Sequence, residues 1–237
     1  MAISLNSSSR LLDTLSAGDA GQLSSHLRTV DLVQGTVLFD LGDIVDRVYF
    51  PHSGVISLVV TLETGEMVET GMVGRDSLLG GAYALDGSVS LNKAVVQIAG
   101  TASVIDVEHV RSAAKASASF RTILTRHEQL ILVQAQQSAA CNISHTLEAR
   151  LSRWLLRCRD LMGSDSLALT QEFLSQMLGA QRSSVSIVAG TLQQAGLIRY
   201  RRGNIHINNV EGLKEAACEC YEAVKGQSDR LLGVASI

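Results

Sequence analysis

Arginine and serine side chains gather in two short stretches in the carboxyl-terminal third of the chain. The first, RSSVS, runs from Arg182 to Ser186, and the second, RYRR, runs from Arg199 to Arg202. Neither stretch contains an acidic residue. Guanidinium groups bind phosphates and guanine edges, and hydroxyls contact phosphates or bases with weak selectivity. These side chains therefore predict a surface that binds nucleic acid.

A helix-turn-helix is the expected frame for the first stretch. Thr170 is a good N-cap for a helix whose apolar residues fall on one face as far as Leu178. Gly179 can adopt the positive φ that ends this helix and opens a tight turn. A second helix follows from about Arg182 and ends at Gly196. This geometry places the start of the second helix in the major groove of DNA.

Two short strands predict a wing after the second helix. The segments 197–200 and 205–207 flank Gly203-Asn204, a hairpin-turn signal. An ordinary helical hairpin on a small sheet would show the same alternation, but the acid-free helix tip and the arginines favour DNA binding. We expect DNA contacts from polar residues of both helices and the wing: Thr170, Gln171, Gln181, Arg182, Ser183, Ser184, Ser186, Arg199, Arg201 and Arg202.

The distribution of charge supports this interpretation. The formal net charge is −3, yet residues 146–210 hold 8 arginines against 4 acidic residues. Residues 1–145 hold 9 basic against 14 acidic residues, and residues 211–237 hold 3 against 5. Positive charge is thus concentrated where attraction to phosphates requires it. The acidic remainder discourages non-specific binding by the rest of the molecule.

Length and composition indicate a folded protein of one or two domains. The 237 residues are 46% hydrophobic, and only one is proline. No stretch approaches the ~20 apolar residues that span a bilayer. The amino-terminal segment lacks the basic start and apolar run of a secretory signal. We therefore expect a cytoplasmic protein with no membrane partner.

The cysteines predict no metal site. In a cytoplasmic chain, Cys141, Cys158, Cys218 and Cys220 are expected to be free thiols rather than disulfides. Cys218 and Cys220 are too close for the usual arm of a metal site, and no second cysteine pair accompanies them. Idle or buried thiols are favoured over a metal or redox site, although a response of the cysteines to redox state stays open.

The amino-terminal half predicts a β-domain preceded by a helical lead-in at residues 9–28. Between about Thr29 and Val107 the hydrophobic period changes towards two, and glycines separate the segments. Many short strands between glycine turns are typical of a sandwich or barrel. The expected strands are Val30–Val33, Val37–Phe39, Val48–Phe50, Val55–Leu62, Glu66–Val73, Ala94–Ala99 and Ala102–Val107.

A long helix is expected from about Glu108 to Ala140. Apolar residues cover more than one of its faces, so the helix must bury two sides. One side would pack on the β-domain, and the other would form a coiled-coil seam with a second copy of the chain. The alternative is a helix that caps the β-domain without dimerisation. The expected seam, with 4-3-4-3 spacing, is Ile123, His127, Leu130, Gln134, Gln137 and Cys141.

Polar residues interrupt this long helical stretch at Asn142–His145, which we interpret as a hinge. An amphipathic helix is expected from about Thr146 to Leu161, and a last helix from Val210 to Leu232. The last helix has apolar residues on one face, so it is expected to pack on the winged domain.

The order of these elements and the segment LTQEFLSQMLG…RSSVSIVAGTLQQAGLI resemble the Crp/Fnr family of bacterial transcription regulators, from about residue 10 to 225. The resemblance implies an α+β fold with a β-roll (double-stranded jelly-roll) sensory domain at 1–107, a dimerisation helix and hinge at 108–145, and a winged helix-turn-helix domain at 146–237. It also implies a homodimer on palindromic double-stranded DNA, RNA polymerase as a partner, and a small-molecule effector that reorients the winged domains.

Two positions of the recognition helix depart from the family pattern. Many relatives carry a glutamate at the position of Ser183 and an arginine at the position of Ile187. Those side chains usually read cytosine and guanine. The resemblance therefore predicts docking on DNA more firmly than it predicts the sequence that is read.

The sensory cassette departs as well. Leu78 lies near the position of the family's ribose-binding glutamate, and Asn92-Lys93 replaces the arginine–serine pair that clamps a cyclic phosphate. A lysine offers only a point charge, so cAMP sensing in the usual way is not expected. Arg75, Asp76, Asn92 and Lys93 remain candidates for holding another anion, or they are solvated turn charges.

Other cofactors of the family have no sequence signature here. The Fnr branch holds an iron–sulfur cluster through an amino-terminal cysteine group, whereas this chain has no cysteine before Cys141. No histidine–proline pairing marks a haem site. The sequence leaves the effector unknown.

Two further classes of function stay open. One is a small-molecule or redox sensor that acts through protein partners after DNA binding has been lost. The other is an enzyme, but no Ser/His/Asp, paired-carboxylate or metal-ligand pattern supports it, so no catalytic residue is expected. Glu66 and Glu69 fall on a strand and are expected to face solvent.

Overall fold

Seven strands of the amino-terminal half form two antiparallel sheets, with orders β1-β7-β3 and β2-β6-β4-β5. The computed structural model describes residues 9–87 and 89–233, so the segment 1–8, where a secretory signal would begin, lies outside the described residues. All seven expected strands are present, with ends that differ by at most two residues. Their bounds are β1 Arg28–Leu32, β2 Val37–Phe39, β3 Arg47–Pro51, β4 Val55–Thr61, β5 Met67–Val73, β6 Lys93–Ile98 and β7 Gly100–Asp106.

Strand β4 is buried on both of its faces. Ile56 and Leu58 point into the core of the β-roll, whereas Val55 and Val59 belong to a second core shared with the carboxyl-terminal helices. Successive side chains of a strand point to opposite faces, so the five buried residues at the start of β4 serve both cores. The four-stranded sheet therefore separates the core of the β-roll from the second core and packs against both.

Short helices frame the β-roll. The expected lead-in forms α1 (Arg10–Asp13) and α2 (Ala17–Ser24), and α3 (Gly81–Ala84) lies between β5 and β6. The side chain of Ser16 accepts a hydrogen bond from the amide of Asp19 at 3.1 Å and so caps α2.

The long helix expected from Glu108 to Ala140 is two helices, α4 (Val107–Ala116) and α5 (Ala118–Ser144). Ser117 between them is extended, and its hydroxyl accepts a hydrogen bond from the amide of Phe120 at 3.2 Å. Serine competes for backbone groups in this way, which a count of apolar periodicity does not register. The expected single helix is thus corrected to a short helix followed by a capped 27-residue helix.

The hinge expected at Asn142–His145 is narrower than predicted. Helix α5 continues to Ser144, and the chain becomes extended only at His145, with φ −115 and ψ 149. Thr146 then caps the next helix through its side chain, which accepts from the amide of Ala149 at 3.3 Å.

The carboxyl-terminal part consists of helices around a three-stranded sheet of order β8-β10-β9. Strand β8 was not predicted. The expected last helix is broken in two at Ala217, which is extended with ψ 155. The elements are α6 Leu147–Met162, β8 Ser166–Ala168, α7 Gln171–Leu178, α8 Arg182–Gln194, β9 Ile198–Arg201, β10 Asn204–Ile207, α9 Val210–Ala216 and α10 Cys220–Leu232.

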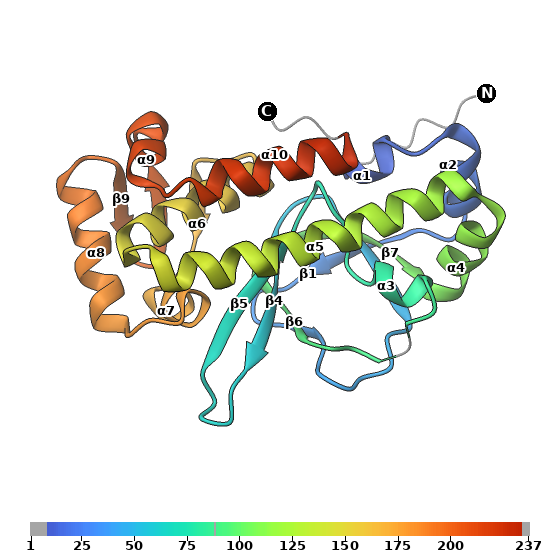
Figure 1. Ribbon diagram of the computed structural model, residues 1–237, viewed down its shortest axis with the longest axis horizontal. Helices are drawn as coiled ribbons and strands as arrows, with labels where there is room; N and C mark the ends of the chain where they lie inside the picture. Colours follow the sequence, from blue (N-terminus) through green and yellow to red (C-terminus); the bar gives the residue numbers. More distant parts are fainter. Residues whose placement is uncertain (1–8, 88, 234–237) are drawn as a thin grey trace.

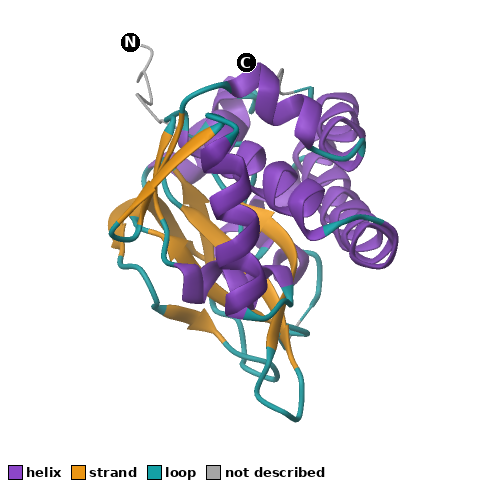
Figure 2. Cartoon of the chain, turned by 90° about the vertical axis from the view of Figure 1, so that its left-hand side faces the viewer, coloured by secondary structure: helices purple, strands orange, loops and turns teal. Residues whose placement is uncertain are grey.

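Helix α5 connects the two halves, and α10 returns beside it in the opposite direction (Figure 1). Strands gather on one side of the molecule and helices on the other when it is turned by 90° (Figure 2). Within residues 9–87 and 89–233, no helix is long and apolar enough to cross a membrane.

Two buried carboxylates join α6 to the β-roll. Trp154 Nε1 on α6 donates to Glu69 Oε1 on β5 at 2.9 Å, and the hydroxyl of Ser57 donates to the other oxygen of Glu69. Arg157 Nη1, one turn further along α6, lies 2.9 Å from Asp76 Oδ2. The expectation that Glu69 faces solvent is therefore wrong, because partners distant in the sequence cover its face of β5.

Close packing of α6 on the β-roll also depends on Gly74. A Cβ atom at this position would lie 2.9 Å from Cβ of Leu161 on α6, and 2.8 Å from its Cδ2. The Cβ of Leu161 is fixed to the backbone of α6, so relief would require the helix to move.

Gly74→Ala should lower the free energy of unfolding by about 1–3 kcal/mol through overpacking at this contact. The midpoint of denaturant unfolding measures the change. Gly190→Ala is the matched control, because nothing lies within 4 Å of the added methyl in the middle of α8. That change should raise the stability by up to about 1 kcal/mol. An unfolding midpoint of Gly74→Ala at or above the wild-type value would contradict the close docking of α6.

Candidate nucleic-acid interface and the elements that control it

Local interactions fix the helix-turn-helix as the sequence predicted. The hydroxyl of Thr170 accepts a hydrogen bond from the amide of Phe173 at 3.2 Å and caps α7. Gly179 ends α7 in the left-handed region with φ 55. The guanidinium of Arg150 on α6 donates to the carbonyl of Leu178, which satisfies an acceptor at the end of α7.

The wing turn lies one residue earlier than predicted. Arg202 and Gly203 both have positive φ, at 49 and 77, and Asn204 already pairs with Arg201 in the ladder. Two central residues with positive φ define the type I′ hairpin. The correction moves the turn from Gly203-Asn204 to Arg202-Gly203 and places an arginine at the tip of the wing.

Three segments that are separate in the sequence meet beside the start of α7. The methyl carbon of Thr170 lies 3.6 Å from the position of a Cβ on Gly203 in the wing. The hydroxyl of Ser186 on α8 lies 2.8 Å from Gln171 Oε1 and 2.9 Å from the carbonyl oxygen of Arg182. Ser186 is thus engaged inside the motif, whereas most of the other predicted contact residues are free to approach a ligand.

Exposure separates these residues into two groups. Ser184 and Ser186, with Gln171, are partly covered, and the exposed residues are Thr170, Gln181, Arg182, Ser183, Arg199, Arg201 and Arg202. Ile187, 70% exposed, lies on the same helix one turn beyond Ser183. Arg182 lies 3.8 Å from Glu172 Oε2, and both side chains are exposed. Such a surface pair is weak, so a phosphate can compete for the guanidinium.

The β-roll contains a pocket beside α3 and α5. Its lining is mainly apolar, with Asn92, His127 and Glu128 as polar members, and it includes no arginine or lysine. His127 Nε2 accepts a hydrogen bond from the amide of Leu78 at 3.2 Å, and its Nδ1 lies 3.2 Å from Glu128 Oε1. A pocket with a carboxylate and no cation is unfavourable to a phosphate.

The four candidate effector residues do not form one site. Asp76 is paired with Arg157, and Lys93 Nζ lies 2.9 Å from Asp40 Oδ2. Arg75 extends to the end of α6, where its Nη1 is 2.8 Å from the position of a Cβ on Gly163. Of the four, only Asn92 lines the β-roll pocket. Arg75, Asp76, Asn92 and Lys93 thus lie in separate surroundings, and their role in holding an anion stays a prediction.

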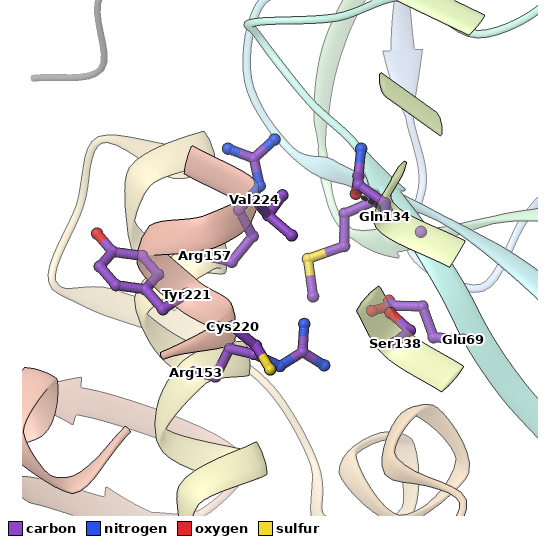
Figure 3. Close-up of a pocket in the computed structure, with 10 residues that line it drawn as sticks. Glu69, Gln134, Ser138, Arg153, Arg157, Cys220, Tyr221 and Val224 are labelled. Atoms are coloured by element: carbon purple, nitrogen blue, oxygen red, sulfur yellow. Dashed lines mark hydrogen bonds between the residues drawn. The ribbon is translucent and has the colours of Figure 1, made fainter. Parts of the chain in front are cut away.

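A second pocket lies between the two halves of the molecule. Figure 3 shows Arg153, Arg157 and Cys220 on one side of it, opposite Gln134 and Glu69. Gln134 Nε2, Arg157 Nη2 and Arg153 Nε have no hydrogen-bond partner in the part of the chain that the structure describes. Buried donors of this kind mark a place for water or for a small ligand that carries acceptors. Sequence patterns do not reveal this pocket, because its residues come from four elements.

The expected coiled-coil seam on α5 is also corrected. His127, Leu130, Gln134 and Cys141 are buried within the same protomer, against the β-roll and α10. Gln134 Oε1, for example, accepts a hydrogen bond from the amide of Met72 at 2.9 Å. Ile123 and Gln137 of the expected seam are partly covered. The apolar period identified the inner face of the helix rather than its outer face.

The opposite face of α5 is exposed and has its own regular spacing. Leu132 is 58% exposed and Ile143 is 87% exposed, although both are large and apolar. They belong to a row of exposed residues that are alternately three and four positions apart: Thr122, Thr125, Gln129, Leu132, Gln136, Ala139 and Ile143.

Two family models match the sequence. A cyclic nucleotide-binding domain covers residues 29–117, and a Crp-like helix-turn-helix domain covers residues 149–216. Together they account for more than half of the chain, in the order that the structure shows. The chain belongs to the Crp/Fnr family of transcription regulators. The fold class expected from the sequence, a β-roll, a long helix and a helix-turn-helix domain, is confirmed.

Solved structures of the family share this fold. FixK2 from Bradyrhizobium japonicum aligns with a TM-score of 0.69 and 16% identity, over 81% of this chain and 98% of its own. CLP from Xanthomonas campestris, a c-di-GMP responsive global regulator, aligns at 0.64 with 17% identity, over 81% and 99%. A transcriptional regulator of the CRP/FNR family from Thermus thermophilus aligns at 0.62 with 22% identity, over 80% and 98%. No curated protein sequence matches the chain.

Burial of Glu69 against α6 makes the stability of the folded protein dependent on pH. Burial raises the pKa of Glu69 to about 7, against the opposing effect of its hydrogen bond from Ser57 and the nearby Arg153. Between the ordinary pKa of 4.5 and this value, the folded state binds more protons than the unfolded state. The free energy of unfolding must therefore decrease as the pH rises from about 4.5 to 7.

Glu69→Gln should remove this decrease, because the amide has no charge to bury. At pH 8 the variant should exceed the wild type in stability by up to about 3 kcal/mol, and at pH 4 the two should be similar. Denaturant unfolding at each pH gives the comparison. Glu66→Gln, on an exposed residue of the same hairpin, should retain the wild-type pH profile. A Glu69→Gln profile that keeps the wild-type slope would show that ionisation of Glu69 does not cause it.

Proposed function

We propose that this Crp/Fnr-family protein is a homodimeric regulator that binds a palindromic DNA site through α8 and the wing. The observation that carries the proposal is the continuous surface formed by the exposed start of α8, the start of α7 and the arginine-bearing wing tip. Cations on this surface would contact phosphates, and the first turns of α8 would enter the major groove. Members of this family are transcription regulators rather than enzymes, so we expect no catalytic activity from this protein. We expect RNA polymerase as a partner and the cytoplasm as the place of action.

Dimerisation through the outer face of α5 would supply the second half-site. Residues three and four positions apart form the contact row of a coiled coil, and Leu132 and Ile143 would be its apolar members. Several other members of the row are polar, so we expect a dimer of moderate stability that binding to two half-sites reinforces.

Base readout by α8 would differ from that of relatives with charged readers. Ser183 offers a hydroxyl with weak selectivity, and Ile187 offers an exposed apolar side chain that suits the methyl group of thymine. Arg182 would contact a phosphate or a guanine at the edge of the site. We therefore propose an operator half-site that contains a thymine opposite Ile187.

Selection of bound fragments from randomised DNA should yield a palindromic site with binding that weakens steeply as salt rises.

Arg202→Ala should weaken binding to selected and random DNA alike, and reduce the salt slope by about 1 for each phosphate that the wing no longer neutralises. Ile187→Ala should lower affinity for the selected site roughly tenfold and leave random DNA unaffected. Fluorescence anisotropy over a range of salt concentrations separates the two effects.

Equal affinity of the wild type for selected and random DNA would contradict sequence-specific binding. It would favour the rival function, a sensor that acts through protein partners. Loss of specificity in Arg202→Ala, or uniform loss in Ile187→Ala, would contradict the roles given to the wing and to α8.

The double variant Leu132→Glu/Ile143→Glu should convert the dimer into a monomer, because it places like charges along the proposed seam. Sedimentation equilibrium gives the oligomeric state, and binding to the full palindrome should weaken by at least tenfold. Leu41→Glu is the control, since Leu41 is 70% exposed but lies in the turn after β2, outside the proposed seam. A dimer that survives the double substitution with unchanged affinity would contradict this interface.

A further inference from the structure

Three cysteines and a histidine meet where α5 ends and α10 begins. Cys141 is in the last turn of α5 and His145 follows that helix, while Cys218 precedes α10 and Cys220 is its first residue. One potential ligand atom from each residue lies within 4.8 Å of all the others. The Sγ atoms of Cys141 and Cys218 are 3.5 Å apart, and Cys220 Sγ is 3.6 Å from His145 Nδ1.

We propose that these four residues form a Cys₃His site for a single tetrahedral metal ion of the Zn²⁺ type. Tetrahedral zinc has bonds of about 2.3 Å to sulfur and 2.0–2.1 Å to nitrogen, which place neighbouring ligand atoms about 3.6–3.8 Å apart. The two distances in the cluster come close to this spacing. Four protein ligands fill the coordination shell and leave no open position, which is the arrangement of structural rather than catalytic zinc.

Neighbouring side chains complete the arrangement expected around such an ion. His145 presents Nδ1 to the cysteines, and its Nε2 lies 3.2 Å from Glu219 Oε1. A carboxylate behind a ligating histidine fixes the ring orientation and the tautomer that binds metal. Gln137 Nε2 donates a hydrogen bond to Cys220 Sγ at 3.0 Å, as donors to metal-bound sulfur do. Neither contact is needed by the DNA-binding surface.

Charge at the site is consistent with a bound divalent cation. Binding displaces the three thiol protons to solvent, so the ion and three thiolates carry a net charge of −1. Arg153 lines the same pocket as Cys220 and supplies a cation near this centre (Figure 3). The three cysteines are buried and His145 is partly buried, which excludes most water from the ligands.

The position of the site gives the ion a specific structural role. Cys141 in the last turn of α5 and His145 at the hinge supply two ligands, whereas Cys218 in the junction of α9 and α10 and Cys220 at the start of α10 supply the others. An ion bound to all four would tie the hinge to the winged domain and fix its angle relative to α5. Removal of the ion would release this constraint without altering any residue of the DNA-binding surface.

Titration of Co²⁺ into the reduced, metal-free full-length chain tests the site, because tetrahedral thiolate coordination produces intense charge-transfer absorption. The expected result is one Co²⁺ per chain with these bands, displaced by one equivalent of Zn²⁺. Cys141→Ser and Cys218→Ser should each lose most of the charge-transfer absorption. Cys158→Ser is the matched control, because Cys158 is equally buried but lies outside the cluster, beside Met72. It should keep the bands in full.

Absence of thiolate bands in the folded wild type would overturn the proposal. A Cys141–Cys218 disulfide that persists under reductant would do the same, as would recovery of iron with inorganic sulfide. Equal loss of the bands in Cys158→Ser would show that the absorption does not come from this cluster.

A milder variant keeps the test valid if the cysteine variants fail to fold. Glu219→Gln retains all four ligands and should lower the affinity for Zn²⁺ by about 10- to 100-fold, measured by competition with a chromophoric chelator. Glu222→Gln, a change at an exposed residue in the first turn of α10, should bind Zn²⁺ as the wild type does. Equal Zn²⁺ affinity in the two variants would contradict the carboxylate–histidine–metal arrangement.

Discussion

Helix α6 packs its apolar face against the outer side of the four-stranded sheet, and the position of the winged domain depends on this contact. Burial of Trp154, Leu155 and their neighbours provides most of the stabilisation. The ion pair of Arg157 with Asp76 contributes less, since Nε and Nη2 of Arg157 find no partner within the described residues. The ion pair instead fixes the position along the sheet at which α6 packs. The apolar contact thus holds the domains together, and the polar contacts determine how they are aligned.

Features that depend on neighbouring residues could be predicted from the sequence. The cap at Thr170, the left-handed turn at Gly179 and the alternation of the strands each follow from a few adjacent side chains. The same locality explains why the exposed face of α8 and the wing arginines were found without a structure. The error of one residue in the wing turn arose because Gly203-Asn204 is a strong turn signal, whereas the ladder requires the turn at Arg202-Gly203.

Features that depend on distant contacts could not be predicted. The buried state of Glu69 requires Trp154. The apolar period of α5 predicts a dimer seam on what is its inner face, because periodicity does not show which surface covers it. The Cys₃His cluster was missed for the same reason. Cys141 and His145 have the i, i+4 spacing of paired ligands on a helix, and this signal could have been used. Their complement, Cys218 and Cys220, reaches them only through the return of α10 alongside α5.

The arginine at the tip of the wing has a thermodynamic consequence. Arg202 is held at φ 49, in the left-handed region where a residue with a Cβ loses roughly 1 kcal/mol relative to glycine. A glycine would make the hairpin more stable, but it would leave the tip of the wing without this cation. The wing is therefore less stable than its geometry allows, and phosphate binding by Arg202 would offset this cost. Nucleic acid that engages this guanidinium would itself stabilise the turn that presents it.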